Sequence, residues 1–519
     1  MAVSGIGASG ALAFWGAKAV VDTSATPATT ITSLAKAVAA DAAGASVPAA
    51  SQVSIISATP APDLTYSRPL PLKLDQVAWA APPTDDISQL MEGNLSTSND
   101  SSSLLRGLGS ALLERFATTQ DDFQQAAVDF TPSYGSDAAD GTSSVIQTTQ
   151  ADALQNAKEA PNNVSLKVHL VSGKEVDISV SFGGEGKAIQ NSLSVDVHTS
   201  GKLTAAEQTA IAGLSTGFEA ALQGVSQGAA KIDVAGLVNF DPSVLSSVDL
   251  TVRAPPPSQY AAVSADSNPL QSLDFHADAT NRSLAVKSLA GSVSVNVDTS
   301  QSAFLGTTAQ QQTAIQNYLD QFDAANTRGH GDPILLGEFK DGFAQMNSSY
   351  PPVGDPPPQA LSPSVLSAQD HSVLSGLNDF HASMSGDFHN AVAKESGHID
   401  YQVSQSTQSQ GVDKGRLSVA QTQTASLSSQ YAKNRDGADP AKGDYDVYRV
   451  NDSTSTTTAF EYARNKLKAA SITSAVSQLD QYEKLVGYKV VDKKDTPTNR
   501  STVRDISAEW LAAKPSTQG

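Results

Sequence analysis

The chain repeats part of its own sequence between residues 164 and 350. Residues 192–200 read SLSVDVHTS and residues 292–300 read SVSVNVDTS, at an offset of 100 residues. Further on, QTAI at 208–211 is found again at 312–315. Weaker matches flank these two in the same order, and they pair 165–169 with 272–276 and 236–240 with 335–339. Because an ordered series of matches is typical of duplication, we interpret the region as two copies of one structural unit.

Each copy shows the same order of strand and helix signals. In the first copy, apolar and polar residues alternate over 166–170, 176–182 and 193–197, which predicts three strands with one buried face. The sequences TAAE at 204–207 and TAQQ at 308–311 have the Thr-x-x-Glu/Gln spacing of a capping box. We therefore expect a β-meander followed by a packed helix, then a shorter helix, on one face of a sheet.

The fold class predicted for the whole chain is α+β and multidomain. We expect two duplicated β-meander-plus-helix modules, a helical N-terminal segment and an α+β C-terminal segment, with a low-complexity N-terminal region. Pro-rich sequence at 253–258 and 350–358 indicates stiff spacers after each module. The expected parts are 1–84 (low-complexity, largely disordered or extended), 85–163 (helical with a polar linker), 164–252 and 259–349 (the two repeat units), 360–493 (C-terminal α+β segment) and 494–519 (polar tail).

Outside the repeat, periodicity predicts further helices and strands. Apolar residues recur at helical spacing in four segments, which are 104–116, 119–130, 373–392 and 463–485. Polar residues alternate in the manner of strands at 400–410 and 416–427, and these two runs are suited to pair as a hairpin. We expect further strands at 445–450 and 456–462.

The charge and cysteine content exclude several classes of protein. The 519 residues include 34 Lys and Arg against 53 Asp and Glu, for a formal net charge of −19. This excess argues against nucleic acid as a partner, because binding to phosphates requires clustered basic residues. The absence of cysteine excludes disulfide scaffolds, zinc sites with Cys ligands, iron–sulfur clusters and thiol nucleophiles.

The sequence contains no clear targeting signal. No run of about 18 uncharged apolar residues occurs, so we expect no transmembrane helix. The first positive charge, Lys18, follows or interrupts the apolar N-terminal stretch, which does not fit a standard cleaved signal peptide. This stretch fits either a short helix on a domain or an uncleaved export signal. We favour a secreted or surface location, with a cytoplasmic location as the alternative.

Two short motifs match enzyme patterns in the wrong context. GLSTG at 213–217 fits G-x-S-x-G, but a nucleophile elbow needs a strand directly before the serine, and Ser215 follows a helix that starts at Thr204. GIGASG at 5–10 fits G-x-G-x-x-G, but a dinucleotide site needs a preceding strand. The sequence therefore assigns neither catalytic nor cofactor-binding residues.

Two groups of residues are weak candidates for metal ligands. His381 and His389 are eight residues apart, so on one helix they could share a face with Asp387, and imidazole with carboxylate suits a divalent metal. Asp436 and Asp439 flank Gly437 in an acidic loop, and oxygen ligands around a glycine turn suit Ca²⁺. An exposed helix face and an ordinary surface turn are the competing interpretations.

These observations favour a non-catalytic interaction or assembly protein, bacterial in type and exported or surface-associated. Its partner would be another protein or a second copy of itself. A hydrolase remains an alternative, with a site between the repeat modules or in the C-terminal segment. A calcium-dependent binding module that uses Asp436 and Asp439 is a further alternative.

Overall fold

The structure of the chain is a computed structural model. The residues that it describes are 76–97, 101–119, 121–130, 150–183, 189–226, 233–254, 269–348, 366–390, 394–411, 415–435 and 442–512. Within these segments, no helix combines the length and apolarity needed to cross a bilayer. Most of the predicted low-complexity region, residues 1–75 of 1–84, lies outside the described residues.

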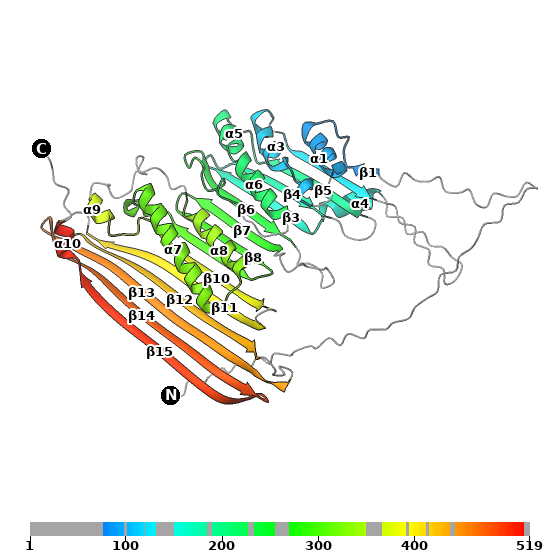
Figure 1. Cartoon of the computed structure of the whole chain (residues 1–519). Coiled ribbons are helices and arrows are strands. Elements are labelled where there is room, and N and C mark those ends of the chain that lie inside the picture. The colour runs from blue at the N-terminus through cyan, green and yellow to red at the C-terminus, as the bar shows by residue number, and fades with distance from the viewer. Residues whose placement is uncertain are drawn as a thin grey trace, which may run out of the picture. The chain divides into compact units, whose positions relative to one another are not determined.

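Within the described residues, fifteen strands form one antiparallel sheet (Figure 1). Their order across the sheet is β1-β2-β5-β4-β3-β6-β7-β8-β9, followed by β10 to β15 in sequence. The strands are β1 (Gln76–Trp79), β2 (Phe123–Phe130), β3 (Asn162–Leu170), β4 (Glu175–Phe182), β5 (Ile189–Thr199), β6 (Leu245–Arg253), β7 (Leu270–Asp278), β8 (Asn281–Ser288), β9 (Ser292–Asp298), β10 (Asp379–Asn390), β11 (Glu395–Gln410), β12 (Ser418–Asn434), β13 (Tyr445–Ala463), β14 (Lys466–Val486) and β15 (Lys489–Asp505).

The predicted α+β multidomain architecture is wrong, because the strands of every expected unit join this one sheet. The ladder between β6 and β7, which pairs Val248 with Ala277, joins the units expected at 164–252 and 259–349. The β9–β10 ladder joins the second unit to the C-terminal segment. A separate module would leave a row of unpaired main-chain groups at each edge, and these ladders satisfy those groups.

The N-terminal segment predicted to be helical also contributes to the sheet. β1 pairs with β2, and β2 pairs with β5, so the sheet begins before residue 85 and continues through the expected helical segment. The helix predicted over 119–130 is wrong, since residues 123–130 form β2. The alternation of residues on β2 places Ala127 in the main core and Val128 in a small cluster on the opposite face.

Two further helix predictions are wrong for a related reason. Residues 463–485 were predicted as a helix and form most of β14, and residues 373–392 contain β10. Both β14 and β10 meet a partner strand along nearly their whole length, and this pairing overrides local periodicity. The polar tail predicted from residue 494 begins inside β15. The strands predicted at 400–410 and 416–427 are confirmed, and they pair as β11 and β12.

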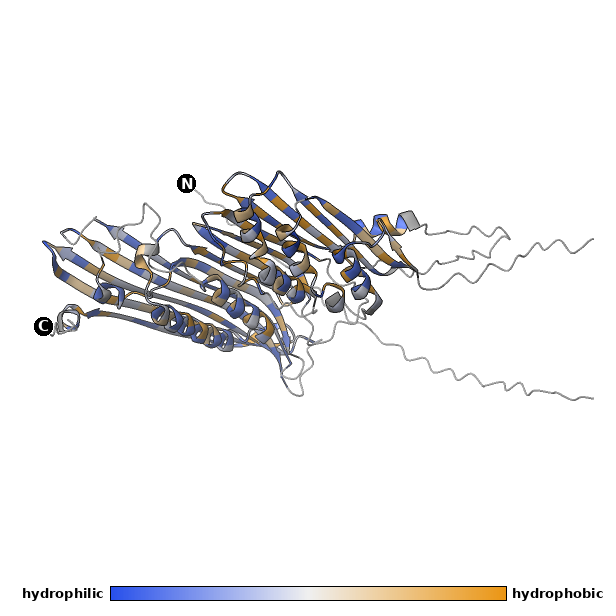
Figure 2. Ribbon diagram, turned by 90° about the horizontal axis from the view of Figure 1, so that it is seen from above, coloured by the Kyte–Doolittle hydropathy of each residue, from blue (hydrophilic) through white to orange (hydrophobic). Residues whose placement is uncertain are grey.

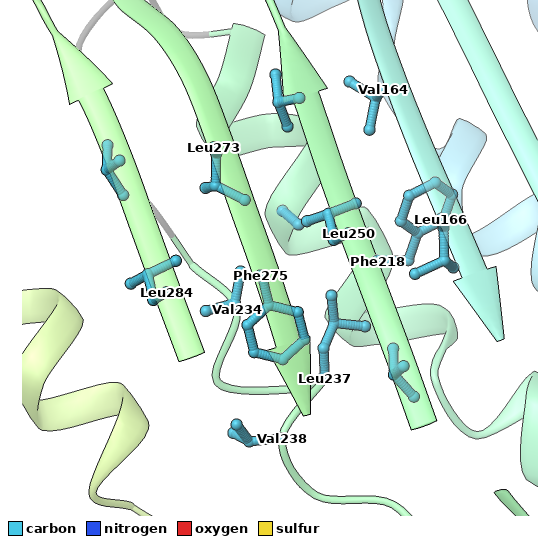
Figure 3. Packing of buried hydrophobic residues seen from close by; sticks show 14 of the residues in the cluster. Val164, Leu166, Phe218, Val234, Leu237, Val238, Leu250, Leu273, Phe275 and Leu284 are labelled. Atoms are coloured by element: carbon cyan, nitrogen blue, oxygen red, sulfur yellow. The ribbon is translucent and has the colours of Figure 1, made fainter. Parts of the chain in front are cut away.

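Helices cover one face of the sheet over most of its width (Figure 1). On this face, which we call the helix face, the apolar residues of β3 to β10 pack against helices in a single core. Figure 3 shows Phe218 of α6 beside Leu166 and Leu250. The described helices are α1 (Asp86–Thr97), α2 (Ser101–Leu104), α3 (Leu108–Glu114), α4 (Gln150–Lys158), α5 (Ala205–Ala212), α6 (Ser215–Ser226), α7 (Thr308–Gly329), α8 (Pro333–Met346), α9 (Ala368–His371) and α10 (Ser507–Ala512), with short 3₁₀ turns at Arg115–Ala117 and Ser302–Phe304.

The helix starts expected in the two copies of the repeat are found close to the predicted positions. Thr204 and Glu207 form the predicted capping box at the start of α5. In the second copy the cap is Thr307, one residue earlier than predicted, and its side chain accepts from the N–H of Gln310. The two copies differ in the path of the chain beyond their helices. After α6 the chain returns as β6 beside β3, whereas after α8 it continues as β10 beside β9. The duplication itself stays an interpretation of the sequence.

The G-x-S-x-G match at 213–217 has a packing explanation. Ser215 starts α6 directly after α5, so no strand precedes it and the geometry of a nucleophile elbow is absent at this serine. A Cβ on Gly217 would lie 2.6 Å from the carbonyl carbon of Gly236, in the loop that carries the buried Val234 and Leu237 (Figure 3). Gly217 therefore allows α6 and this loop to approach closely.

We expect Gly217→Ala to lower the free energy of unfolding by about 1–3 kcal/mol, because the added methyl group overpacks a backbone contact. Gly337→Ala is the matched control, since this exposed glycine in α8 has no neighbouring heavy atom within 4 Å of an added Cβ. Alanine there should raise stability by about 0.5–1 kcal/mol through helix propensity. Urea unfolding of both variants measures the difference, and equal effects would contradict the packing explanation.

Candidate functional site

The described residues leave the face of the sheet opposite the helix face largely uncovered, and we call it the open face. Along each strand, the residues of the open face alternate with the buried apolar residues of the helix face, as the blue and orange bands show (Figure 2). α4 is the exception, because Ala153 and Ala157 pack on Val128 at the β1–β2 corner of this face. Direct cross-strand pairing places Lys167, Asp249, His276, Ser283, Asn296, His381, Ser404, Thr424 and Ser455 in one row across it.

Charged side chains occupy the open face from β2 to β7, and we call this part the charged zone. Its acids and bases alternate from strand to strand: Lys167 of β3 forms ion pairs with Glu175 and Asp177 of β4, the latter at 3.0 Å. Next to it, His198 of β5 lies 2.9 Å from Asp122. Opposite charges on directly opposed strand residues stabilise a sheet, so these pairs support the ladders that they span.

A histidine–carboxylate cluster lies where the two copies of the repeat meet. Asp249 of β6 lies between the two histidines, with Oδ1 2.6 Å from His276 Nδ1 of β7 and Oδ2 3.9 Å from His169 Nε2 of β3. His276 Nε2 also lies 3.2 Å from Asp278. Burial alone would lower the pKa of His276, but its hydrogen bonds with Asp249 and Asp278 outweigh burial and raise it.

Small hydroxyl and amide side chains cover the middle of the open face from β10 to β15, and we call this middle part the hydroxyl zone. It contains an open depression of about 540 Å³. Cross-strand hydrogen bonds join some of its side chains, including Ser404 with Thr424 at 2.7 Å and Thr422 with Thr457 at 3.1 Å. The depression is lined by His381, Gln402, Val403, Ser404, Thr424, Ala425, Ser426, Ser453, Thr454, Ser455, Ala475, Val476, Ser477 and Asn499.

The depression follows from side-chain size and strand length. β11 to β15 are 16 to 21 residues long, and their open-face residues near the middle are mostly Ser, Thr and Ala. Short side chains leave the backbone close to the surface, and the lining also includes the longer side chains of Gln402 and His381. The resulting surface offers many hydrogen-bond donors and acceptors and little formal charge.

The structure places the predicted metal ligands of β10 on one face without bringing them together. His381, Asp387 and His389 are all exposed on the open face. Eight residues of a strand span about 26 Å, so the two histidines are too far apart to share an ion. Asp387 instead pairs with His398 of β11, whose Nδ1 lies 2.8 Å from Asp387 Oδ1.

The predicted Ca²⁺ ligands Asp436 and Asp439 lie outside the described residues. Among the residues that the structure describes, no group of three or more His, Asp or Glu side chains is arranged to hold a metal ion. The Ca²⁺ site at Asp436 and Asp439 stays a prediction of the sequence. The hydroxyl zone was not predicted as a site. The polar residues that alternate at 400–410 and 416–427 form part of it and were the sequence signal from which it could have been found.

We expect Asp249→Asn to weaken the dependence of thermal stability on pH. The pKa of His276 is higher in the folded than in the unfolded chain, so its charge stabilises the fold fully below the ordinary value of about 6.5. This stabilisation is lost as the pH rises through the raised pKa. The melting temperature of the variant should therefore fall below that of the wild type more at about pH 5.5 than at about pH 8.5.

Asp274→Asn is the matched control for this measurement. Asp274 lies on the same face of β7 and pairs with Arg253, whose charge does not change in this pH range. Its variant should lower the melting temperature equally at both pH values. A pH-independent effect of Asp249→Asn would show that His276 does not gain its stabilisation from Asp249.

Comparison with known proteins places no relative beside this chain: no family model, curated protein or solved structure matches it. Its function must therefore be inferred from its own surfaces. The open face, with its charged zone and its hydroxyl zone, is a broad surface that the described helices leave largely uncovered.

Proposed function

We propose that this chain is a non-catalytic interaction or assembly protein that binds a protein partner, or a second copy of itself, through the hydroxyl zone. The depression in that zone is the observation that carries the proposal. An exported or surface-associated location is part of the proposal, and it is supported by the Ser-, Thr- and Gln-rich strands exposed to solvent.

The shape of the depression favours a broad partner over a small molecule. Small-molecule sites are concave, mostly apolar and bury most of their ligand. This depression is open, lies across β10 to β15 and is bordered by hydroxyl, amide and imidazole groups. Such a surface is suited to many weak hydrogen bonds over a wide area, as in polar protein interfaces.

The surface is large enough for a specific interface. With strands about 4.8 Å apart and residues about 3.3 Å apart, five strands paired over some ten residues present about 800 Å² on one face. Standard interfaces bury about 800 Å² on each partner. The small side chains Ser, Thr and Ala lose little rotamer freedom on binding, which lowers the entropic cost of association.

We expect Thr424→Arg to abolish binding, because its long side chain would fill the depression and add a charge. The native protein, the variant and a control are each immobilised, exposed to extract of the source cells, and washed. The same three proteins are compared for self-association by sedimentation velocity at high salt, where contacts held by charge alone are screened. A partner or self-associated species found with wild type should be lost at least tenfold with Thr424→Arg.

Ala285→Arg is the control, since Ala285 is exposed on the open face at β8, outside the depression. It should keep the partner or the self-associated species. A species retained equally by both arginine variants would contradict binding through the hydroxyl zone. The absence of any partner and of any self-association in the native protein would contradict the proposed function as a whole.

A further inference from the structure

Charge is distributed very unevenly between the two edges of the sheet. β14 and β15, from Lys466 to Asp505, carry eight basic and five acidic side chains. The rest of the chain carries 26 basic and 48 acidic residues. We call the strands β14 and β15 the basic edge. In an acidic protein, this concentration of positive charge at one border of the sheet is a feature that the fold itself does not require.

The basic edge is exposed, and some of its basic side chains have no acidic partner among the described residues. β15 is the last strand of the sheet, and all but one of its residues are exposed. Lys493 is shared between Glu483 and Asp495, at 3.6 and 4.0 Å. Lys494 and Arg500 form no ion pair with any acid among the described residues.

The opposite border of the sheet has the opposite sign. Residues 76–130, which include β1, α1, α3 and β2, carry eight acidic and two basic side chains. We call them the acidic edge. Asp86, Glu92 and Glu114 are exposed there. β1 is the first strand of the sheet, so one sheet has an acidic and a basic border.

We propose that copies of this chain associate head to tail, with the basic edge of one copy against the acidic edge of the next. Charge complementarity on the two borders of one sheet supports a second copy as the occupant, because both halves of the contact are present on every molecule. In a contact between two different surfaces, every copy keeps one free edge for a further copy. Such contacts build open chains, or a ring where the rotation between copies closes.

Side chains, more than continued strand pairing, would hold this contact. Pro497 lies in the middle of β15 and has no main-chain N–H to donate, and β1 is only four residues long. Lysines on an edge strand also oppose direct pairing with another sheet. The association should therefore depend on charge and be reversible, with a strong dependence on salt.

The test uses the full chain in sedimentation velocity over a dilution series at low and high salt. Raising NaCl from about 0.01 M to about 1 M shortens the Debye length from about 30 Å to about 3 Å. At low salt, the weight-average mass should rise with concentration well above the 53.7 kDa of one chain. At high salt it should return to that value.

Charge-reversed variants identify the surfaces. The basic-edge variant carries Lys493→Glu, Lys494→Glu and Arg500→Glu, and it should stay monomeric at low salt. The acidic-edge variant carries Asp86→Lys, Glu92→Lys and Glu114→Lys, and it should also stay monomeric. An equimolar mixture of the two should associate in pairs, because the acidic-edge variant keeps a native basic edge and the basic-edge variant keeps a native acidic edge. Loss of fold cannot produce this recovery.

The matched control reverses three exposed basic residues elsewhere, Lys202, Lys287 and Arg416, each to Glu. None of the three forms an ion pair within the described residues. The net charge changes by the same amount as in the basic-edge variant, and both edges keep their native residues. The control should associate as the wild type does. A monomeric wild type at low salt, or a mixture of variants that stays monomeric, would overturn the proposal.

Two further measurements distinguish head-to-tail association from binding at the hydroxyl zone and from binding to an anionic surface. Thr424→Arg, which tests the hydroxyl zone, should leave head-to-tail association unchanged, so the two proposals can fail independently. Vesicles of anionic lipid serve as a second probe for the basic edge. Salt-sensitive vesicle binding by a wild type that does not self-associate would overturn the proposal and assign the basic edge to an anionic surface.

Discussion

Main-chain hydrogen bonding between neighbouring strands is the interaction on which the whole described fold depends. Fourteen ladders join β1 to β15, and each satisfies donors and acceptors that would otherwise face solvent at an edge. Apolar packing supports only part of this sheet, because the main core reaches no further than Val450 of β13. Beyond it, β14 and β15 are held by their ladders and by a small cluster around Trp510 of α10. Within the described residues, one sheet thus has a part that helices support and a part that they leave largely open on both faces.

The strands under the helices were predictable, because only one of their faces is buried. Alternation at 166–170, 176–182 and 193–197 correctly predicted β3, β4 and β5. On β14 the same reasoning failed. Ile472 and Val476 lie on the helix face and Leu479 lies on the open face. All three are partly exposed, so no single apolar stripe was required. Apolar residues could then fall at helical spacing without forming a helix.

Prediction of the candidate site from the sequence was limited in the same way. His381 and His389 would be about 12 Å apart along a helix but are about 26 Å apart along a strand, so the predicted metal site depended on the element type. Polar alternation predicted that strands such as β11 and β12 exist. The depression also requires the register that sets Ser404 opposite Thr424 and Thr424 opposite Ser455, and register between distant strands is not readable from one strand alone.

The return of β6 to the side of β3 has a consequence for how the chain folds. β6 joins a strand that ended some 75 residues earlier, after the chain has passed through α5 and α6, whereas β10 to β15 pair in sequence order. Closing such a long loop costs more entropy than closing a hairpin and slows the step that depends on it. The C-terminal half is therefore suited to fold by adding hairpins in turn. In the N-terminal half, strands that are distant in the sequence must pair before the sheet can form. This half should therefore fold more slowly than the C-terminal half.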